Sequence, residues 1–456
     1  MNISIAVVIF LLTVFASISL NGIMRNIAKN NRWLIDIPDK NRKFHLTPTP
    51  VTGGIAIQIA MLTGFLALFF LADFTIQSEI RNLPLTSNTI NDGDFHKKSL
   101  KLENSDQNEI FDLLISETQS NNESDFEVQL QGSDEVVEIK MLENGVFRVN
   151  NNGNFSDYVI QNGNVVSLAG DVSESYKFSG SKPFEINKFV ILFIIFGLLL
   201  QAFTLVDDAW GINPKIRITF QVLLNLLFCL ASGIYVNDIG FGVGNENIQL
   251  GFLGIPFTVF CVTGIINAFN MIDGINGLCA SMVISALIGF IIITGLDVVN
   301  YAFVIAFGGI FGFLIYNLGV VGEKRRVFLG DNGSSFLGFF VAWACIYLSS
   351  AENNFFNPVT ALWLVFIPFL DCMNVILQRM RRGKKLFSPD RNHLHHLLMK
   401  REINPLTVLS YIFLISLFFV FIGISLDYFG ISASISLLLF LISGSIYLYF
   451  TQRLSE

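Results

Sequence analysis

Eleven hydrophobic runs, each close to 20 residues long, restrict the fold of this 456-residue chain more than any other feature. A run of about 20 apolar residues spans the hydrocarbon core of a bilayer as a helix, and in lipid its backbone groups find partners only within a helix or a closed barrel. Charged residues make up 14% of the chain, against about 25% in an average soluble domain. A single soluble domain is therefore excluded, and the sequence predicts an all-α polytopic membrane protein with about 11 transmembrane helices. The runs lie at roughly 3–23, 53–73, 188–206, 218–236, 252–268, 277–295, 301–318, 334–350, 358–378, 406–426 and 431–451.

The first run has the length of a signal-peptide core but lacks the other features of one. No basic residue precedes it, no A-x-A-like site follows it, and Arg25 and Lys29 come after it. A signal peptide carries its positive charge before the apolar region and ends at small residues. We therefore expect an uncleaved helix with its N-terminus outside.

Residues 74–187 interrupt the series of hydrophobic runs. The segment is rich in Asn, Ser, Asp and Glu, and Asn-Gly pairs at 144–145, 152–153 and 162–163 lie between short clusters of β-forming residues. Asn-Gly in that setting is typical of β-hairpins. We expect a small β-rich insertion, with a helix at 107–116 left open, between two parts of a membrane core, 1–73 and 188–456.

Basic residues are distributed unequally between alternate loops. With the N-terminus outside, the inward loops and the C-terminus carry 20 Lys and Arg, the short outer loops carry none, and the other 9 lie in 74–188. Short loops rich in Lys and Arg remain cytoplasmic. The net charge of −7 divides into −11 for 74–187 and +4 for the rest. We expect the C-terminus to be cytoplasmic and the acidic insertion to be extracytoplasmic.

Polar clusters also fall on the inner side, in separate segments of the chain. Ionisable residues in or beside membrane helices are costly and are therefore candidates for function. Their placement at one membrane face predicts a single cytoplasmic site. The clusters are Asp207-Asp208, Asn267 with Asn270 and Asp273, Asp331, and His393 with His395 and His396.

The adjacent carboxylates of Asp207 and Asp208 suit cation chemistry. They repel each other, and a divalent cation or a proton relieves that repulsion. Lys215 follows at a distance that reaches a phosphate. The structural alternative is a pair of solvated charges at a helix end.

Two glycine-containing turns carry further candidates. Asn267, Asn270 and Asp273 recur every three residues and share one helical face, and their oxygens suit a hard cation or the edge of a nucleotide. Phe328-Leu-Gly-Asp331 precedes a helix, whose N-terminal N–H groups favour phosphate. The structural alternative for the first turn is helix capping with hydrogen bonds between helices, and for Asp331 it is a charge at a helix N-terminus.

Two inner loops complete the candidate site. The loop 379–405 is the most basic, and three of the five histidines fall within it. Imidazoles beside Arg391 suit a diphosphate, zinc stays open although no Cys accompanies them, and membrane topology alone also explains the basic run. Lys43 and His45 suit a lipid phosphate at headgroup depth, or form only a structural turn. Together the clusters predict phosphoryl chemistry with a divalent metal, on a substrate lying partly in lipid.

Five motifs, in this order along the chain, resemble those of the polyprenyl-phosphate N-acetylhexosamine-1-phosphate transferases, glycosyltransferase family 4. The resemblance covers roughly 1–73 and 188–430. It implies transfer of a sugar 1-phosphate from a UDP-N-acetylhexosamine to undecaprenyl phosphate, release of UMP, and a requirement for Mg²⁺ or Mn²⁺. The His-x-His-His form of the last motif is similar to the branch that uses UDP-N-acetylglucosamine. The motifs are Lys43–His45 with Gly53-Gly54, Asp207-Asp208, Asn267–Gly274, Phe328–Ser334 and Pro389–His396.

The resemblance also implies a setting. It places the protein in the bacterial inner (plasma) membrane, at the start of a lipid-linked cell-envelope polysaccharide such as O-antigen lipopolysaccharide or teichoic acid. The expected partners are the two substrates and the bilayer, with no nucleic acid. Relatives suggest a homodimer.

On the family motifs, the candidate residues group by role. Asp207, Asp208, Asp273 and Asp331 are the expected catalytic carboxylates, and Asp331, Asn270 and Asp208 the expected metal ligands. Lys43 and His45 are expected to bind the lipid phosphate. Asn276 departs from the many family members that have Asp there, and an amide cannot act as a general base, so we expect hydrogen bonding or metal contact from it. The residues expected to bind the nucleotide sugar and its phosphates are Lys215, Asn267, Asn270, Asn276, Phe328, Arg391, His393, His395 and His396.

Two other classes of function stay open. A membrane transporter of an anionic solute would place polar groups at the midplane, in broken helices. Here we expect continuous helices with the polar groups at one face. A binding module on a membrane anchor would instead place the function in 74–187, about which the resemblance says nothing.

Overall fold

The computed structural model divides into two compact units, Met1–Leu68 with Ile186–Glu456, and Phe69–Glu185. In the first unit it describes residues 3–38, 47–68, 188–243, 246–295, 300–350, 353–383 and 392–455, and in the second the helical residues 69–81 and eight strands between 98 and 178.

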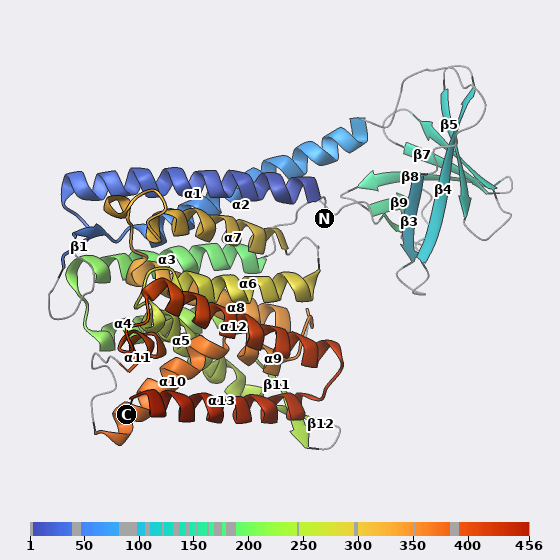
Figure 1. Ribbon diagram of the computed structural model, residues 1–456. Coiled ribbons are helices and arrows are strands. Elements are labelled where there is room, and N and C mark those ends of the chain that lie inside the picture. The colour runs from blue at the N-terminus through green and yellow to red at the C-terminus, as the bar shows by residue number, and fades with distance from the viewer. Residues whose placement is uncertain are drawn as a thin grey trace. The chain divides into compact units, whose positions relative to one another are not determined.

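Helices occupy all eleven hydrophobic runs of the sequence (Figure 1). Eight of the described helices are long and apolar enough to cross a membrane, and a bent pair adds a ninth if it counts as one span. Two more, α6 and α7, are apolar but shorter. The protein is therefore a multi-pass membrane protein, and the number of 11 spans stays a prediction. The helices are α1 Ile3–Asn31, α2 Gly53–Arg81, α3 Lys188–Trp210, α4 Pro214–Ser232, α5 Gly254–Ile272, α6 Leu278–Thr294, α7 Asn300–Asn317, α8 Gly330–Ser349, α9 Pro358–Leu364, α10 Phe366–Arg381, α11 Leu394–Met399, α12 Pro405–Tyr428 and α13 Ala433–Ser455.

The expectation of one continuous helix at 358–378 is wrong. The run forms two helices, α9 and α10, that meet at an angle of 79°. Val365, between them, has φ −114° and ψ 23°, outside the helical region. Pro368 follows three residues later and has no N–H to bond to the carbonyl of Leu364, so the helical ladder is already interrupted there.

Helix α8 is the most deeply buried of the eight candidate spans and organises the core around it. Trp343 of α8 packs against Phe228 of α4 with ring centroids 4.2 Å apart. Its indole Nε1 donates to Asn225 Oδ1 at 3.2 Å, so this buried polar group has a partner. The core therefore fixes α8, whose first turn carries Asp331.

The second unit contains an antiparallel closed barrel of eight strands. The helix considered at 107–116 is wrong where the structure describes it, because β4 runs through Ile110–Ser120 and pairs with β5 from Leu113↔Leu130 to Ser120↔Glu123. The hydrogen bonds between β4 and β5 along this length outweigh any preference of residues 110–116 for a helix. The strands are β3 Lys98–Asn104, β4 Ile110–Ser120, β5 Glu123–Leu130, β6 Val136–Leu142, β7 Val146–Asn151, β8 Asn154–Gln161, β9 Asn164–Ser167 and β10 Tyr176–Phe178.

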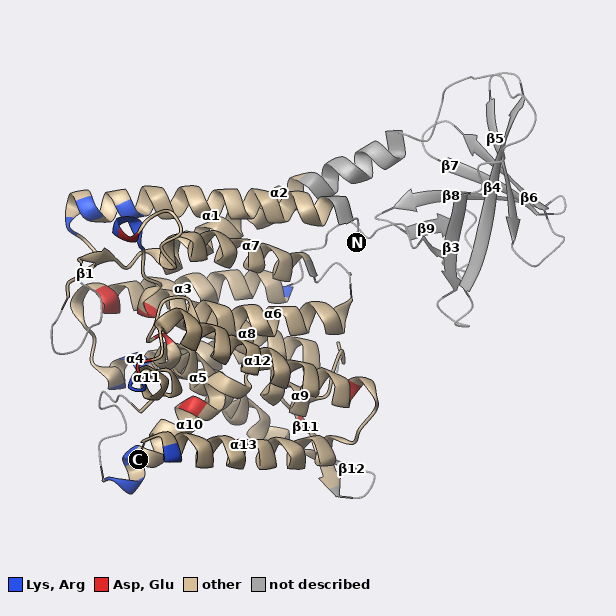
Figure 2. Ribbon diagram, viewed as in Figure 1, with Lys and Arg blue, Asp and Glu red and all other residues tan. Residues whose placement is uncertain are grey.

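Most described Lys and Arg of the helical unit gather at one end, where α1, α10 and α13 terminate, whereas Lys188 begins α3 at the other end (Figure 2). Arg25 and Lys29 lie near the end of α1, Arg379 and Arg381 near the end of α10, and Arg453 near the end of α13. This is the end that the loop charges mark as inner. The side of the membrane that it faces remains a prediction.

Candidate active site

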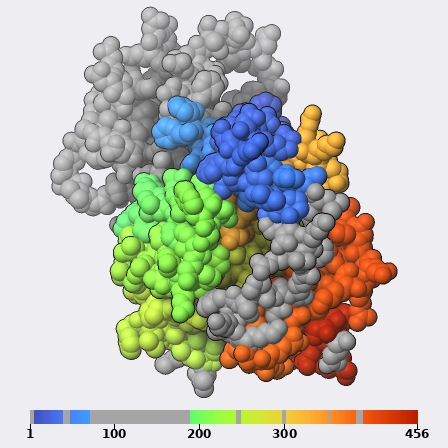
Figure 3. Space-filling view, turned by 90° about the vertical axis from the view of Figure 1, so that its left-hand side faces the viewer, coloured from blue at the N-terminus to red at the C-terminus, as the bar shows by residue number. Residues whose placement is uncertain are grey.

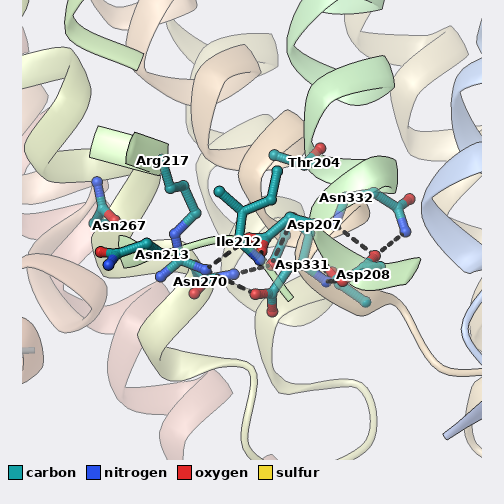
Figure 4. Close-up of polar contacts among 12 residues, drawn as sticks. Thr204, Asp207, Asp208, Ile212, Asn213, Arg217, Asn267, Asn270, Asp331 and Asn332 are labelled. Atoms are coloured by element: carbon teal, nitrogen blue, oxygen red, sulfur yellow. Dashed lines mark hydrogen bonds and ion pairs between the residues drawn. The ribbon is translucent and has the colours of Figure 1, made fainter. Parts of the chain in front are cut away.

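Three carboxylates and one guanidinium meet at this end of the helices (Figure 4). Asp207 lies in the last turn of α3, Arg217 in the first turn of α4 and Asp331 in the first turn of α8. Arg217 Nη1 lies 2.8 Å from Asp331 Oδ2 and 3.3 Å from Asp207 Oδ2. The guanidinium therefore holds together two carboxylates from helices far apart in the sequence.

Asp208, the second carboxylate of the α3 pair, caps α8. Its Oδ1 accepts the backbone N–H of Asp331 at 3.1 Å, and its Oδ2 accepts both the backbone N–H of Asn332 at 3.1 Å and the Asn332 side-chain amide at 2.5 Å. The first N–H groups of a helix have no partner within it, and the helix N-terminus favours a negative charge. Asp208 thus fixes the backbone that carries Asp331.

Gly330 permits this close approach. Its φ of +79° is a conformation that residues with a side chain rarely adopt, and a Cβ there would lie 2.9 Å from Asp208 Oδ2. The Gly-Asp pair in the sequence therefore reflects the packing of α3 on the start of α8.

Exposure separates the roles that the carboxylates can take. The Asp331 side chain is 44% exposed, whereas that of Asp207 is 7% exposed. Asp207 Oδ1 also accepts the backbone N–H of Ile212 at 2.6 Å. Of the two carboxylates that Arg217 contacts, Asp331 is therefore accessible to a ligand, and Asp207 is buried.

The last turns of α5, with Asn267 and Asn270, and the turn between α5 and α6 contribute further polar groups to the site. Asn270 Nδ2 donates to Ser334 Oγ of α8 at 3.0 Å, so its amide oxygen is the group left to accept. Asn267 Nδ2 donates to Gln221 Oε1 of α4 at 2.7 Å. Burial, with the negative charges of Asp331 and Asp208, raises the pKa of Asp273 to about 8. Asn276 is partly buried three residues further on.

The histidine segment, His393–His396, packs against the turn between α5 and α6. His393 Nδ1 lies 2.7 Å from Asp371 Oδ2. His395 is 1% exposed, and neither of its ring nitrogens has a hydrogen-bond partner among the described residues. Its ring lies so close to Gly274 that a Cβ there would overlap Nε2. Burial, then the neighbouring His396, lowers the pKa of His395 to about 3, so the imidazole is neutral.

The first inner loop reaches the site through its backbone. Phe328 N donates to Pro50 O at 2.8 Å, and Gly53 N donates to Phe328 O at 3.0 Å, so Phe328, itself partly buried, is fixed beside the start of α2. The space-filling view onto this end of the helical unit shows that blue, green and orange to red segments, far apart in the sequence, all reach it (Figure 3). Lys43, His45 and Arg391 lie outside the described residues.

Arg217, which the sequence reasoning did not single out, contacts the carboxylates. Lys215 is exposed in the first turn of α4, and its role in binding phosphate stays a prediction. The sequence reasoning also overlooked Asp371. The signal was present, because Asp371 is the sole acid in the run 358–378 and an acid within a membrane helix is a candidate for function.

A divalent metal is compatible with this donor set in one way. Among the residues that the structure describes, no three His, Cys, Asp or Glu side chains are close enough together to hold a metal ion. Mg²⁺ is commonly bound by one or two carboxylates together with substrate phosphates. The exposed carboxylate of Asp331 fits that pattern, whereas the oxygens of Asp208 are engaged by α8.

Fold and site together define a multi-pass membrane protein with an acidic and histidine-containing polar site at one end of its helices. Residues 190–349 match the model of glycosyl transferase family 4. This segment contains the carboxylates of α3 and α8 and the α5–α6 turn.

Named relatives agree with the family model. The undecaprenyl-phosphate alpha-N-acetylglucosaminyl 1-phosphate transferase of Escherichia coli K12 is 34% identical over 254 residues, which are 54% of this chain and 68% of that protein. The protein of the same name from Salmonella typhimurium is 32% identical over 269 residues, 58% of this chain and 72% of that protein. The chain therefore belongs to glycosyl transferase family 4, as its motifs predicted.

Proposed function

We propose that the protein transfers N-acetylhexosamine 1-phosphate from a UDP-N-acetylhexosamine, in the first place UDP-N-acetylglucosamine, to undecaprenyl phosphate and releases UMP. The relatives' names support the sugar phosphate and the lipid acceptor. The observation that carries the proposal is the meeting of Asp207, Arg217 and Asp331 at one end of the membrane helices. A soluble nucleotide and a lipid phosphate can both reach such a place.

The reaction needs one bond made and one broken. An oxygen of undecaprenyl phosphate attacks the phosphorus that carries the sugar, the bond from that phosphorus to the bridging oxygen breaks, and UMP leaves with the bonding electrons. The attacking phosphate is already anionic, so little deprotonation is needed. Catalysis then consists mainly of positioning and electrostatic stabilisation.

The described residues divide this work. Asp331 and the amide oxygen of Asn270 would hold Mg²⁺ or Mn²⁺, and the metal would neutralise charge on the phosphates of the donor. Asp208 fixes Asp331 through the start of α8. Arg217 orients the Asp331 carboxylate. The imidazoles of His393 and His396 would donate to the donor phosphates, whereas His395, which is 1% exposed, packs against both of these rings.

We also propose an orientation, which the distribution of Lys and Arg supports. The site faces the cytoplasm of a bacterial inner membrane, the N-terminus and 74–187 lie outside, and the lipid-linked sugar feeds a cell-envelope polysaccharide.

Asp331→Asn tests the assignment. UMP release that requires both UDP-N-acetylglucosamine and undecaprenyl phosphate is measured with purified protein in detergent. Loss of the carboxylate should lower kcat by about 100-fold or more, the usual effect of removing one electrostatic group at a reacting phosphate or oxyanion. Glu323→Gln is the matched control, because Glu323 is an 80% exposed acid shortly before α8 and should leave the rate within twofold.

The rival function is transport of an anionic solute. The break between α9 and α10 is a feature that transporters share. Solute uptake into proteoliposomes without UMP release would favour the transporter. UMP release dependent on both substrates favours the transferase.

A further inference from the structure

Asp371 of α10 is a carboxylate buried in the membrane unit, with 1% of its surface exposed. A carboxylate in an apolar interior costs free energy unless hydrogen bonds satisfy it. Three groups do so here: His393 Nδ1 at 2.7 Å from Oδ2, the backbone N–H of Leu394 at 2.8 Å from Oδ1, and Tyr447 Oη at 3.2 Å from Oδ1. Two of these partners belong to the histidine segment, His393–His396.

The bond to Leu394 fixes where α11 begins. Leu394 is the first residue of this short helix, and its N–H has no acceptor within the helix. Asp371, on a different helix, accepts this N–H. His393 occupies the N-cap position but makes no side-chain capping bond. The Asp371 carboxylate therefore caps α11 in place of the usual N-cap side chain.

The bond to His393 orients its imidazole. An ionised carboxylate only accepts hydrogen bonds, so Nδ1 of His393 carries the proton in this pair. Nε2 is then the nitrogen directed away from Asp371, and it can donate to a phosphate when the ring carries a proton on both nitrogens. Carboxylates that orient the ring of a functional histidine act through this arrangement.

The position of His395 depends on the same anchor. Its ring lies parallel to that of His393, with centroids 5.6 Å apart and planes 15° apart, and 4.1 Å from that of His396. Neither ring nitrogen of His395 has a hydrogen-bond partner among the described residues. Among the described residues, only packing holds this ring in place, so a shift at the start of α11 would be transmitted to it.

Tyr447 connects the last helix to the segment. It lies in α13 and is 8% exposed, and its hydroxyl donates to Asp371 Oδ1. The histidine segment is thus held from two sides, by α10, the helix that precedes it in the chain, and by α13, the last helix.

We propose that Asp371, held by Tyr447, is a positioning residue that sets the His393–His396 segment for binding the phosphates of the nucleotide-sugar donor. The inference rests on the proposed function. It requires that loss of the carboxylate weakens the use of the donor and leaves the lipid acceptor largely unaffected.

The test is steady-state kinetics on the full-length protein in detergent, with UDP-N-acetylglucosamine and undecaprenyl phosphate varied separately. In Asp371→Asn the side chain keeps one acceptor oxygen, so it cannot accept from both His393 and Leu394, and its NH₂ group replaces one of the two acceptors. We expect kcat/KM for the donor to fall by about 10- to 100-fold, as when a carboxylate behind a functional histidine is removed, and KM for undecaprenyl phosphate to stay within about twofold. Tyr447→Phe removes one hydrogen bond, and should lower donor kcat/KM by about threefold to tenfold.

Asp427→Asn is a matched control. Asp427 of α12 accepts the backbone N–H of Asn357 at 3.1 Å and Thr360 Oγ1 at 3.0 Å, so it also binds the start of another helix, α9. The same replacement there should leave donor kcat/KM within about twofold. An equal loss in both variants would overturn the proposal, because it would show a general effect on folding.

A double variant tests whether Asp371 acts through His393. If it does, Asp371→Asn combined with His393→Gln should be no worse than the more severe single variant, and losses that multiply would overturn the proposal. If Asp371→Asn does not fold, Tyr447→Phe decides, and unchanged donor kinetics in that variant would overturn it. Failure of the unaltered protein to release UMP would instead refute the proposed function.

Discussion

A single methyl group added at Gly274 should disable the donor site. Gly274 faces the ring of His395, and a Cβ there would overlap Nε2 and lie 2.7 Å from Cε1. Ordinary van der Waals contact begins at 3.4 Å, so Cε1 must retreat by about 0.7 Å, the difference between 3.4 and 2.7 Å, and Nε2 by more. A misplacement of about 1 Å in a group that positions the substrate can lower the rate by about 100-fold.

His395 has little room for that retreat. It is 1% exposed and packs 4.1 Å from the ring of His396. Gly274 is not among the glycines with positive φ, so Ala adopts its backbone conformation without strain. The displaced ring, rather than the backbone, is therefore the main consequence of Gly274→Ala.

The assay is kcat/KM for UDP-N-acetylglucosamine, with the melting temperature measured in parallel. We expect a loss of about 100-fold for Gly274→Ala. Gly264→Ala is the control, because a Cβ at Gly264 in α5 would meet nothing within 4 Å, and it should behave as the unaltered protein. Gly274→Ala with donor kinetics within threefold of the unaltered protein would refute a requirement for His395 at this position.

Two further predictions concern charge. Arg217→Gln leaves the Asp207 and Asp331 carboxylates without their shared cation. Charge-assisted hydrogen bonds contribute about 1.5–3 kcal/mol each, and the lower half of that range applies because Arg217 is 21% exposed. The melting temperature and the rate of UMP release should therefore both fall. An unchanged melting temperature would contradict the ion pairs. The pKa of Asp273, raised from 3.8 to about 8, means that the folded state holds this proton more tightly. The contribution of this proton to the free energy of unfolding is full below about pH 4 and is lost as the pH rises through about 8. Asp273→Asn should therefore flatten the pH dependence of the melting temperature over this range. A pH dependence equal to that of the unaltered protein would contradict the raised pKa.

Apolar runs near 20 residues could be assigned to helices from the sequence, because lipid leaves the backbone of such a run few other choices. The break at Val365 could not be found in the same way. A hydropathy window averages over many residues, whereas the break depends on one backbone conformation and on the N–H that Pro368 lacks.

The site was predicted as a set of residues but not as a set of contacts. Lys215 and Arg217 are two residues apart, so they project about 200° apart around α4, and only the rotation of that helix decides which one meets Asp331. Asp208 caps a helix that begins more than one hundred residues later. The role of Asp371 depends on its contacts with His393 and Tyr447, and these contacts form only when α10, α11 and α13 pack together.

The fate of the sugar-bearing phosphate tests the central claim most directly. UDP-N-acetylglucosamine labelled with ³²P in the phosphate attached to the sugar is incubated with the purified protein and undecaprenyl phosphate. Transfer of sugar 1-phosphate predicts that the label enters the lipid fraction in a one-to-one ratio with released UMP, and that Asp331→Asn abolishes both. Label that stays in soluble UDP while the sugar enters the lipid, or label that never leaves the donor, would contradict the account.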